Sequence, residues 1–443
     1  MFENKKIFIF GMAKSGYEAA KLLSKYNNEI LITDGKEQDE NHVKELTDLG
    51  VKVEITTNQI DLIDNTFDYM IKNPGIPANN PVVLKAKELG IKIINEIEMA
   101  YHFLPKNTKI IGITGSNGKT TTTTLIYEIL KRKYENVYLG GNIGYPLSQI
   151  VNDIKDNSIL VMEISDHQLC DMYEFKTNIS LLLNLVHAHI DFHGTYEIYK
   201  AMKKRIFNNH TNTDLAILNH DNSDVLELTN DIVSTKKYFS KTDKLDAYIE
   251  NDGIYYNNEL VLKFSDIKLK GMHNYENIMA CILAVKEFDV ENEIIKEYLS
   301  TFKGVEHRIE YVDTINGVDY YNDSKSTNNE ATMTALKTFK NPTILIMGGL
   351  DRNIPFDNLA DYVSNVKAIV CYGETKNKIK EFADNNNVNC YVLENLNEAV
   401  NKAYEIAESG DTVLLSPACA SWDQFKTFEE RGELFKNLVK GLR

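Results

Sequence analysis

The chain has few cysteines, and their positions exclude some classes of protein. It contains five cysteines in 443 residues, at Cys170, Cys281, Cys371, Cys390 and Cys419. They are scattered, odd in number and never spaced as C-x-x-C, so they fit reduced thiols better than a disulfide framework or a zinc site. We therefore expect a cytoplasmic protein.

Long apolar runs are also absent from the sequence. A membrane-spanning helix needs about 20 mostly apolar residues. The strongest run here, ISLLLNLV at 179–186, has only the length of a strand and contains Asn184. The N-terminal stretch MFENKKIFIFG is too short in apolar residues for a signal peptide. The sequence therefore predicts neither a membrane span nor export.

Positive charge is in deficit. There are 49 Lys and Arg against 64 Asp and Glu, which gives a formal net charge of −15. Nucleic acids and anionic membrane surfaces are recognised by basic patches, so we expect neither as a partner. With 43% hydrophobic and 26% charged residues, the composition is typical of a folded globular protein.

The order of apolar segments predicts an α/β fold in three units. In the first unit, short apolar strands such as 6–10 and 30–33 alternate with helix-length segments, which favours a parallel sheet with crossover helices. A second unit begins near Thr108, and the alternation restarts past Gly304. We expect domains at residues 1–97, 98–304 and 305–443.

The sharpest chemical motif is TGSNGKTT, between a predicted strand and a predicted helix. Its small residues let backbone N–H groups face a phosphate, Lys119 supplies a point charge, and Thr120 offers a hydroxyl to Mg²⁺. The strict G-x-x-x-x-G-K-[ST] spacing is not met, because Ile113 stands where the first glycine would be. The order of elements still predicts a phosphate loop made of Gly115, Ser116, Asn117, Gly118, Lys119, Thr120 and Thr121.

Other polar residues leave alternatives open. Glu163, near the end of an apolar strand, is well placed to hold a metal beside a phosphate loop. The histidines of HAHIDFH at 187–193 suggest a transition-metal cluster or, alternatively, a solvent-facing loop. Lys203, taken alone, is a solvated surface lysine. GMAKSG at 11–16, with Asp34, half-resembles a dinucleotide fingerprint; its glycine spacing disfavours a dehydrogenase and leaves a nucleotide diphosphate site open.

Taken together, the motifs resemble those of the Mur ligases of peptidoglycan precursor synthesis, most closely the members that add D-glutamate. The resemblance covers essentially the whole chain. It implies an N-terminal Rossmann-like domain, a central P-loop ATPase-like domain and a C-terminal Rossmann-like domain. It rests on ITGSNGKTTT at 113–122, GGNIG at 140–144, HIDFHG at 189–194, GMHNYEN at 271–277, NDSKSTN at 322–328 and SPACASWDQFKTFEERG at 416–432.

The resemblance implies an ATP-dependent ligase that phosphorylates the carboxylate of UDP-N-acetylmuramoyl-L-alanine, after which the amine of D-glutamate attacks the acyl phosphate. It also implies that Lys119, His189 and Lys203 are catalytic and that Lys203 is carbamylated. Two Mg²⁺ sites are expected, with ligands among Thr120, Glu163, His189 and Lys203. We expect the protein to act as a monomer.

Residues that bind each substrate are carried over from the same resemblance. Besides the phosphate loop, the expected ATP-binding residues are Asn274, Asn277, Arg308, Asp323 and Lys325. The expected uridine-nucleotide residues are Lys14, Ser15, Asp34, Lys36, Asn73, Gly75, Asn142, Ser165 and Gln168. The expected D-glutamate residues are Thr327, Arg352, Ser421 and Phe428.

The chain departs from the family pattern at three places. Asp166 and His167 follow Ser165 where we expect Ser and Phe, Arg352 replaces a frequent lysine, and Ala13 stands where some members have glycine. Two alternatives are another ligase of the superfamily, including a folylpolyglutamate synthetase, and a nucleotide-binding homologue without catalysis. The C-terminal run at 416–432 disfavours the first, and the joint presence of the catalytic and metal-binding residue types disfavours the second.

Overall fold

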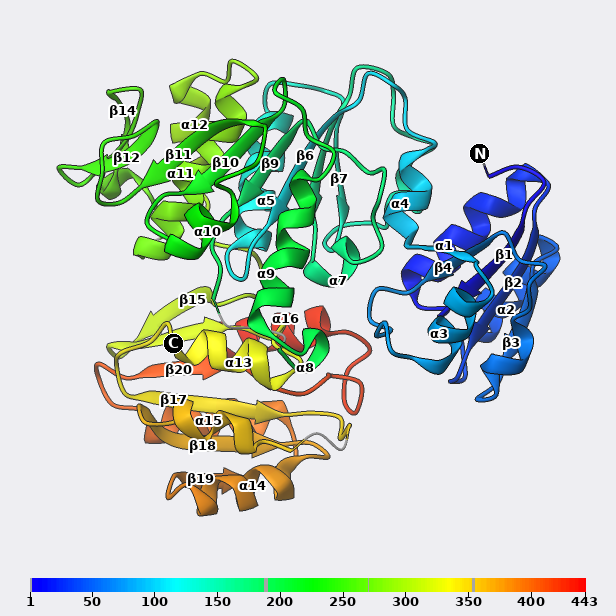
Figure 1. Cartoon of the computed structure of the whole chain (residues 1–443). Helices are drawn as coiled ribbons and strands as arrows, with labels where there is room; N and C mark the ends of the chain where they lie inside the picture. The colour runs from blue at the N-terminus through cyan, green and yellow to red at the C-terminus, as the bar shows by residue number, and fades with distance from the viewer. Residues whose placement is uncertain (1, 187–189, 270, 353–354) are drawn as a thin grey trace. The chain divides into compact units, whose positions relative to one another are not determined.

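The computed structural model describes residues 2–186, 190–269, 271–352 and 355–443. It divides into two compact units, Met1–Phe302 and Lys303–Arg443 (Figure 1). The first unit contains two sheets and the second contains one, so the α/β fold with three sheet-containing domains is confirmed. The exact domain limits stay a prediction.

The N-terminal sheet has five parallel strands in the order β3-β2-β1-β4-β5. Its central strand β1 is apolar and buried along almost its whole length, as expected for a strand covered on both faces. The strands are β1 Lys6–Phe10, β2 Glu29–Asp34, β3 Lys52–Ile55, β4 Tyr69–Lys72 and β5 Lys92–Ile94. The helices are α1 Lys14–Leu23, α2 Glu40–Asp48 and α3 Pro81–Glu88.

The middle sheet has nine strands in the order β14-β13-β12-β11-β10-β9-β6-β8-β7. Its strands are parallel except for the antiparallel pairs β12–β13 and β13–β14 at one edge. The strands are β6 Lys109–Thr114, β7 Val137–Gly141, β8 Ile159–Glu163, β9 Ile179–Leu182, β10 Leu215–Asn219, β11 Thr235–Ser240, β12 Ala247–Glu250, β13 Gly253–Tyr256 and β14 Glu259–Lys263.

Helices α5 and α11 pack together against this sheet and share one apolar core with it. The longer helices of this part are α5 Lys119–Lys131, α9 Tyr196–Lys204, α11 Met272–Lys286 and α12 Asn292–Leu299. The shorter ones are α4 Glu96–Tyr101, α6 Leu147–Ile150, α7 Asp166–Leu169, α8 Ile190–His193 and α10 Ser223–Leu228. Among the described residues, no helix has both the length and the apolar character that a membrane crossing requires.

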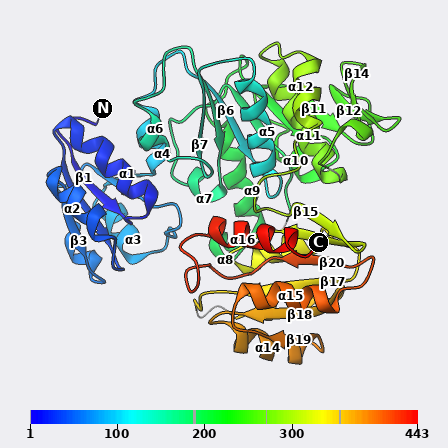
Figure 2. The same ribbon diagram turned by 180° about the vertical axis from the view of Figure 1, so that it is seen from behind.

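The second unit is a six-stranded sheet in the order β15-β16-β20-β17-β18-β19 with helices on both faces (Figure 2). Helices α13 and α14 belong to one apolar core, and α15 and α16 to the other. The strands are β15 Glu310–Ile315, β16 Val318–Asn322, β17 Thr343–Gly348, β18 Val366–Tyr372, β19 Asn389–Val392 and β20 Thr412–Leu415. The helices are α13 Asn329–Leu336, α14 Lys376–Asn385, α15 Leu396–Ile406 and α16 Phe428–Lys440.

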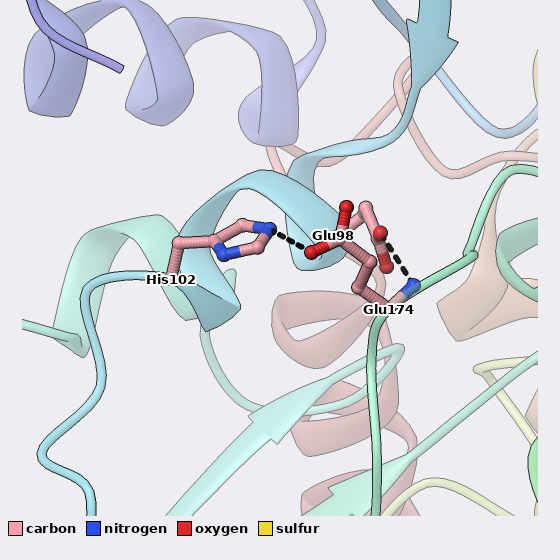
Figure 3. A group of neighbouring side chains, drawn as sticks. All are labelled: Glu98, His102 and Glu174. Atoms are coloured by element: carbon pink, nitrogen blue, oxygen red, sulfur yellow. Dashed lines mark hydrogen bonds and ion pairs between the residues drawn. The ribbon is translucent and has the colours of Figure 1, made fainter. Parts of the chain in front are cut away.

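A buried carboxylate joins helix α4 to the segment that precedes β9 (Figure 3). The two oxygens of Glu98 accept hydrogen bonds from the backbone N–H groups of Glu174 at 2.7 Å and Phe175 at 2.9 Å. His102 Nε2 lies 3.9 Å from a carboxylate oxygen of Glu174. Because both Glu98 oxygens are engaged by main-chain donors, this group is a structural junction.

Candidate functional site

The phosphate loop lies between the end of β6 and the start of α5. Gly118 has φ +83°, and a Cβ there would lie 2.2 Å from Asn277 Oδ1, so the loop requires glycine at this position. The loop is held from one side by Asn184, whose carbonyl and side-chain oxygens accept from the backbone N–H groups of Ser116 and Asn117. Lys119 Nζ donates to the carbonyls of Gly115 at 2.8 Å and Ser116 at 2.9 Å. The lysine ammonium thus lies inside the loop.

Glu163 lies beside this loop. It ends β8 and pairs in register with Ile113 of β6, so its side chain is at the carboxyl edge of the sheet. One of its oxygens accepts from Asn142 Nδ2 at 2.6 Å. The other oxygen, Oε2, is buried and has no hydrogen-bond partner in the described part of the chain. A buried carboxylate oxygen without a donor suits a cation, so the residues present fit Mg²⁺.

Lys203 is fully buried, contrary to what its sequence context alone indicates. Its Nζ lies 3.1 Å from Thr114 Oγ1 at the end of β6 and 3.1 Å from Asp166 Oδ1. Burial lowers the pKa of the Lys203 ammonium, and the Asp166 carboxylate opposes that shift. Asp166 Oδ2 is in turn 2.7 Å from His193 Nε2. The structure therefore brings Lys203 to the phosphate loop.

The adenine-region prediction involves the start of α11. Asn274 and Asn277 are buried there, and Asn277 Nδ2 donates to Asn274 Oδ1 at 3.4 Å. Asn277 also faces Gly118 of the phosphate loop. Both asparagines are therefore next to the loop. His189 lies outside the described residues.

The predicted uridine-nucleotide residues of the first sheet gather at the carboxyl ends of β1, β2 and β4. Asp34 accepts from the backbone N–H groups of Met12 at 2.8 Å and Lys36 at 3.0 Å. Asn73 donates to Ser15 Oγ at 3.4 Å and accepts from the N–H of Gly75 at 3.0 Å. The carboxyl ends of parallel strands are the usual ligand-binding edge of such sheets.

The remaining uridine-nucleotide residues lie on other elements of the same unit. Lys14 Nζ lies 4.9 Å from the ring centroid of Tyr145. Ser165 and Gln168 form a reciprocal cap at the start of α7, in which each side chain bonds the other's backbone N–H. Asn142 is the donor to Glu163 described above.

In the second unit, the loop after β16 is organised by Asp323. Its oxygens accept from Ser416 Oγ at 2.7 Å, Ser326 Oγ at 2.5 Å and the backbone N–H of Ile309 at 3.2 Å. Burial raises the pKa of Asp323 to about 6, and the nearby Arg308 opposes that shift. These bonds engage both oxygens of Asp323 and hold the loop that also carries Lys325 and Thr327.

Three of the predicted D-glutamate residues lie on loops at the carboxyl ends of this sheet, namely Thr327, Arg352 and Ser421. The Ser421 hydroxyl is buried and has no hydrogen-bond partner among the described residues. Arg352 lies over the exposed ring of Trp422, 4.8 Å from its centroid. Phe428 is the first residue of α16, and its carbonyl accepts from Ser324 Oγ at 2.7 Å.

Sequence reasoning did not single out several residues that organise these loops. They include Asn184, which holds the phosphate loop, and Arg431, which is fully buried in the second unit. Asp166 is a different case, because the sequence marks it as a departure from the family pattern without indicating its ion pair with Lys203.

Two family models match the chain. The Mur ligase middle domain matches residues 113–285, and the glutamate ligase domain of Mur ligases matches residues 307–419. The UDP-N-acetylmuramoylalanine–D-glutamate ligase of Geobacillus kaustophilus is 44% identical, with 100% of this chain and 99% of the relative covered. The protein of the same name from Bacillus cereus strain G9842 is 43% identical, with 100% and 98% covered.

Two solved structures have the same architecture at low identity. A UDP-N-acetylmuramate–alanine ligase from Thermotoga maritima gives a TM-score of 0.58 at 18% identity and covers 99% of this chain and 100% of that one. A MurF ligase from Thermotoga maritima in complex with ADP gives 0.58 at 16% identity and covers 100% and 96%. At this level of identity the likeness concerns the fold.

Proposed function

This chain belongs to the Mur ligase family, and we propose that it joins D-glutamate to UDP-N-acetylmuramoyl-L-alanine with the consumption of ATP, a cytoplasmic step of peptidoglycan synthesis. The observation that carries this proposal is the full-length match, at 43–44% identity, to relatives named for that reaction. The clusters described above support it, because a phosphate loop, a buried carboxylate beside it and polar residues at strand ends are the residue types that such a reaction uses. We propose that the protein works as a monomer.

The proposed reaction has two steps. A carboxylate oxygen of the alanine moiety attacks the γ-phosphorus of ATP, which gives an acyl phosphate and ADP. The amine of D-glutamate then attacks the acyl carbon, loses a proton, and phosphate leaves from the tetrahedral intermediate to give the amide. Neither step requires a covalent bond to the protein, so catalysis consists of alignment and charge neutralisation.

The phosphate loop supplies the proposed charge neutralisation. With ATP bound, the Lys119 ammonium would exchange its two loop carbonyls for phosphate oxygens, which are stronger acceptors. Asn274 and Asn277 are proposed to face the adenosine part, and in the second unit Arg308, Asp323 and Lys325 are proposed ATP residues. Thr120, Glu163 and His189 are proposed to hold Mg²⁺, which when bound would offset the charge of the phosphates.

The other two substrates are assigned to the remaining clusters. Residues at the carboxyl edge of the first sheet, together with Asn142, Ser165 and Gln168, are proposed to bind the uridine nucleotide. The buried, unpartnered hydroxyl of Ser421 and the cation of Arg352 suit a dicarboxylic amino acid. Thr327 and Phe428 complete the proposed D-glutamate site.

Lys203 is proposed to be carbamylated. Its amine nitrogen would add to CO₂ and release a proton, which converts the side chain into an anionic oxygen ligand for Mg²⁺. Burial of the amine supports this proposal, because it lowers the pKa and favours the neutral, nucleophilic form. In the unmodified side chain Asp166 holds the nitrogen, so carbamylation would replace that ion pair. Isotopically labelled bicarbonate should give a carbamate signal in wild-type protein that Lys203→Ala lacks; equal spectra would refute the modification.

The test of the proposed function is phosphate release from ATP and Mg²⁺ with each substrate omitted in turn. Release should require both UDP-N-acetylmuramoyl-L-alanine and D-glutamate. Release that needs neither substrate would contradict the proposal. Replacement of D-glutamate by L-lysine or D-alanyl-D-alanine without loss of rate would indicate another ligase of the superfamily, and no turnover with any acceptor would indicate a non-catalytic homologue.

A further inference from the structure

Arg431, on the first turns of α16, is the largest side chain of the described chain that is fully buried. An arginine keeps its charge in proteins, so burial requires compensation for the lost hydration. Here the compensation comes from neutral oxygens. The guanidinium donates to Ser324 Oγ at 2.9 Å, the Ser324 carbonyl at 2.8 Å, the Cys419 carbonyl at 3.1 Å and the Gly348 carbonyl at 3.4 Å.

These acceptors lie at the carboxyl ends of three strands, where three separate loops begin. Ser324 follows β16, Gly348 ends β17 and Cys419 follows β20. The loops also touch one another closely, since a Cβ on Gly349 would lie 2.1 Å from the Ala420 carbonyl. One side chain therefore joins all three loops to α16.

Each proposed D-glutamate residue is a near neighbour of one of these contacts along the chain. Thr327 comes shortly after Ser324 in the sequence, Arg352 shortly after Gly348 and Ser421 shortly after Cys419. Phe428 lies about one turn before Arg431 on α16. A shift of any loop would move one of these side chains. The guanidinium therefore contacts each of the chain segments that carry the proposed amino-acid site.

The charge of Arg431 is not cancelled by a contacting carboxylate. None of the ion pairs between described residues includes Arg431, and its hydrogen bonds go to the neutral oxygens named above. Asp423 interacts with it only through space: burial raises the pKa of that carboxyl, and Arg431 opposes the rise. A buried cation whose hydrogen-bond partners are neutral contributes positive potential at the strand ends.

We propose that Arg431 is a positioning residue for the amino-acid substrate, which fixes the three loops in one arrangement and makes the site electropositive for a dicarboxylic amino acid. This inference rests on the proposed function, because it takes D-glutamate as the ligand of these loops. Arg431 does not touch the reacting atoms; it acts through Thr327, Arg352, Ser421 and Phe428.

The test compares Arg431→Met, Arg431→Lys and Ser324→Ala with wild type. The control is Lys436→Met, which removes another mostly buried cation of α16, one that pairs with Glu306, Glu310 and Glu433. The KM and kcat for each of the three substrates are measured by phosphate release. Trp422 is the single tryptophan of the chain and follows Ser421, so its fluorescence reports D-glutamate binding in the presence of the nucleotide substrate and a non-hydrolysable ATP analogue.

In Arg431→Met, kcat/KM for D-glutamate should fall about 100-fold, as expected when reacting groups are misplaced by about 1 Å. The KM values for ATP and for the uridine nucleotide should stay at the wild-type level. The affinity for D-glutamate measured by Trp422 fluorescence should fall in parallel with kcat/KM. Arg431→Lys, which keeps the charge but cannot reach all the acceptors, should be intermediate. Ser324→Ala should show a smaller loss in the same direction. Lys436→Met should lower the unfolding midpoint without changing the KM for D-glutamate.

A wild-type KM for D-glutamate in Arg431→Met, or an equal rise of all three KM values, would overturn the inference. If that variant does not fold, Arg431→Lys and Ser324→Ala decide the question by the same criterion. Wild-type protein is assayed first: if it does not use D-glutamate, the proposed function fails, whereas normal wild-type turnover with unchanged variants refutes the role of Arg431 alone.

Discussion

Glu163 and Glu98 are two buried glutamates that should respond in opposite ways to the same substitution. Glu163 is 2% exposed and Glu98 is 1% exposed. The oxygens of Glu98 both accept backbone N–H groups, whereas Glu163 Oε2 has no partner in the described residues. Replacement by glutamine keeps the shape and removes the charge, so the two variants separate a structural carboxylate from a functional one.

The expected size of each effect follows from these bonds. In Glu98→Gln an amide NH₂ faces a backbone N–H, and loss of a charge-assisted bond should lower the free energy of unfolding by about 2–3 kcal/mol. In Glu163→Gln the bond from Asn142 persists and a buried charge disappears, so the metal-free protein should be unchanged or gain up to about 2 kcal/mol. Turnover of Glu163→Gln should fall about 100-fold, since charge stabilisation at the reacting phosphate is lost.

Thermal unfolding without metal and phosphate release with Mg²⁺ measure the two effects on the same samples. Glu98→Gln should lower the unfolding midpoint and, at a temperature where it is folded, keep wild-type turnover. If Glu163→Gln instead loses stability and keeps its turnover, Glu163 has a structural role and the metal assignment is wrong.

Three further outcomes are expected. Lys119→Ala should abolish phosphate release without changing the circular dichroism spectrum. Turnover of this variant at the wild-type rate would refute the role of the loop. Gly118→Ala should abolish ATP binding because of its contact with Asn277, whereas Gly50→Ala, which also has a positive φ (+81°) but open space, should cost only about 1 kcal/mol of stability. Burial raises the pKa of Glu96 from 4.5 to about 7. The protonated acid is therefore favoured in the folded state. Its contribution to the free energy of unfolding is fully present below pH 4.5 and is lost as the pH rises through about 7. In Glu96→Gln the unfolding midpoint should depend less on pH over that range. The same pH dependence as in wild type would contradict the assignment.

The sequence predicts elements best where burial on both faces makes them continuously apolar. Strand β1 coincides with the expected 6–10, and α5 follows the phosphate loop as the motif predicts. Strand β16 falls outside the predicted strands, because its sequence VDYYN mixes polar and aromatic residues whose burial depends on pairing with β20. Strand β7 also falls outside the predicted strands, and it ends in the glycine pair of the GGNIG motif.

The candidate sites also divide into residues that one local motif places together and residues that only the fold brings together. Residues within one contiguous motif, such as the phosphate loop, are predictable because local geometry places them together. The ion pair between Lys203 and Asp166 joins residues on different elements, and its partner cannot be read from either segment. Arg431 is harder still to predict, because an arginine near a helix start is ordinarily exposed and the burial of this one depends on contacts with three segments outside its own helix.

The most direct test of the central claim follows the oxygen that leaves the substrate carboxylate. The protein is given UDP-N-acetylmuramoyl-L-alanine with heavy oxygen in the alanine carboxylate, together with ATP, Mg²⁺ and D-glutamate, and the released phosphate is analysed by mass spectrometry. If ATP activates that carboxylate as an acyl phosphate, each phosphate released with the amide product carries one heavy oxygen. Amide product accompanied by unlabelled phosphate would contradict it.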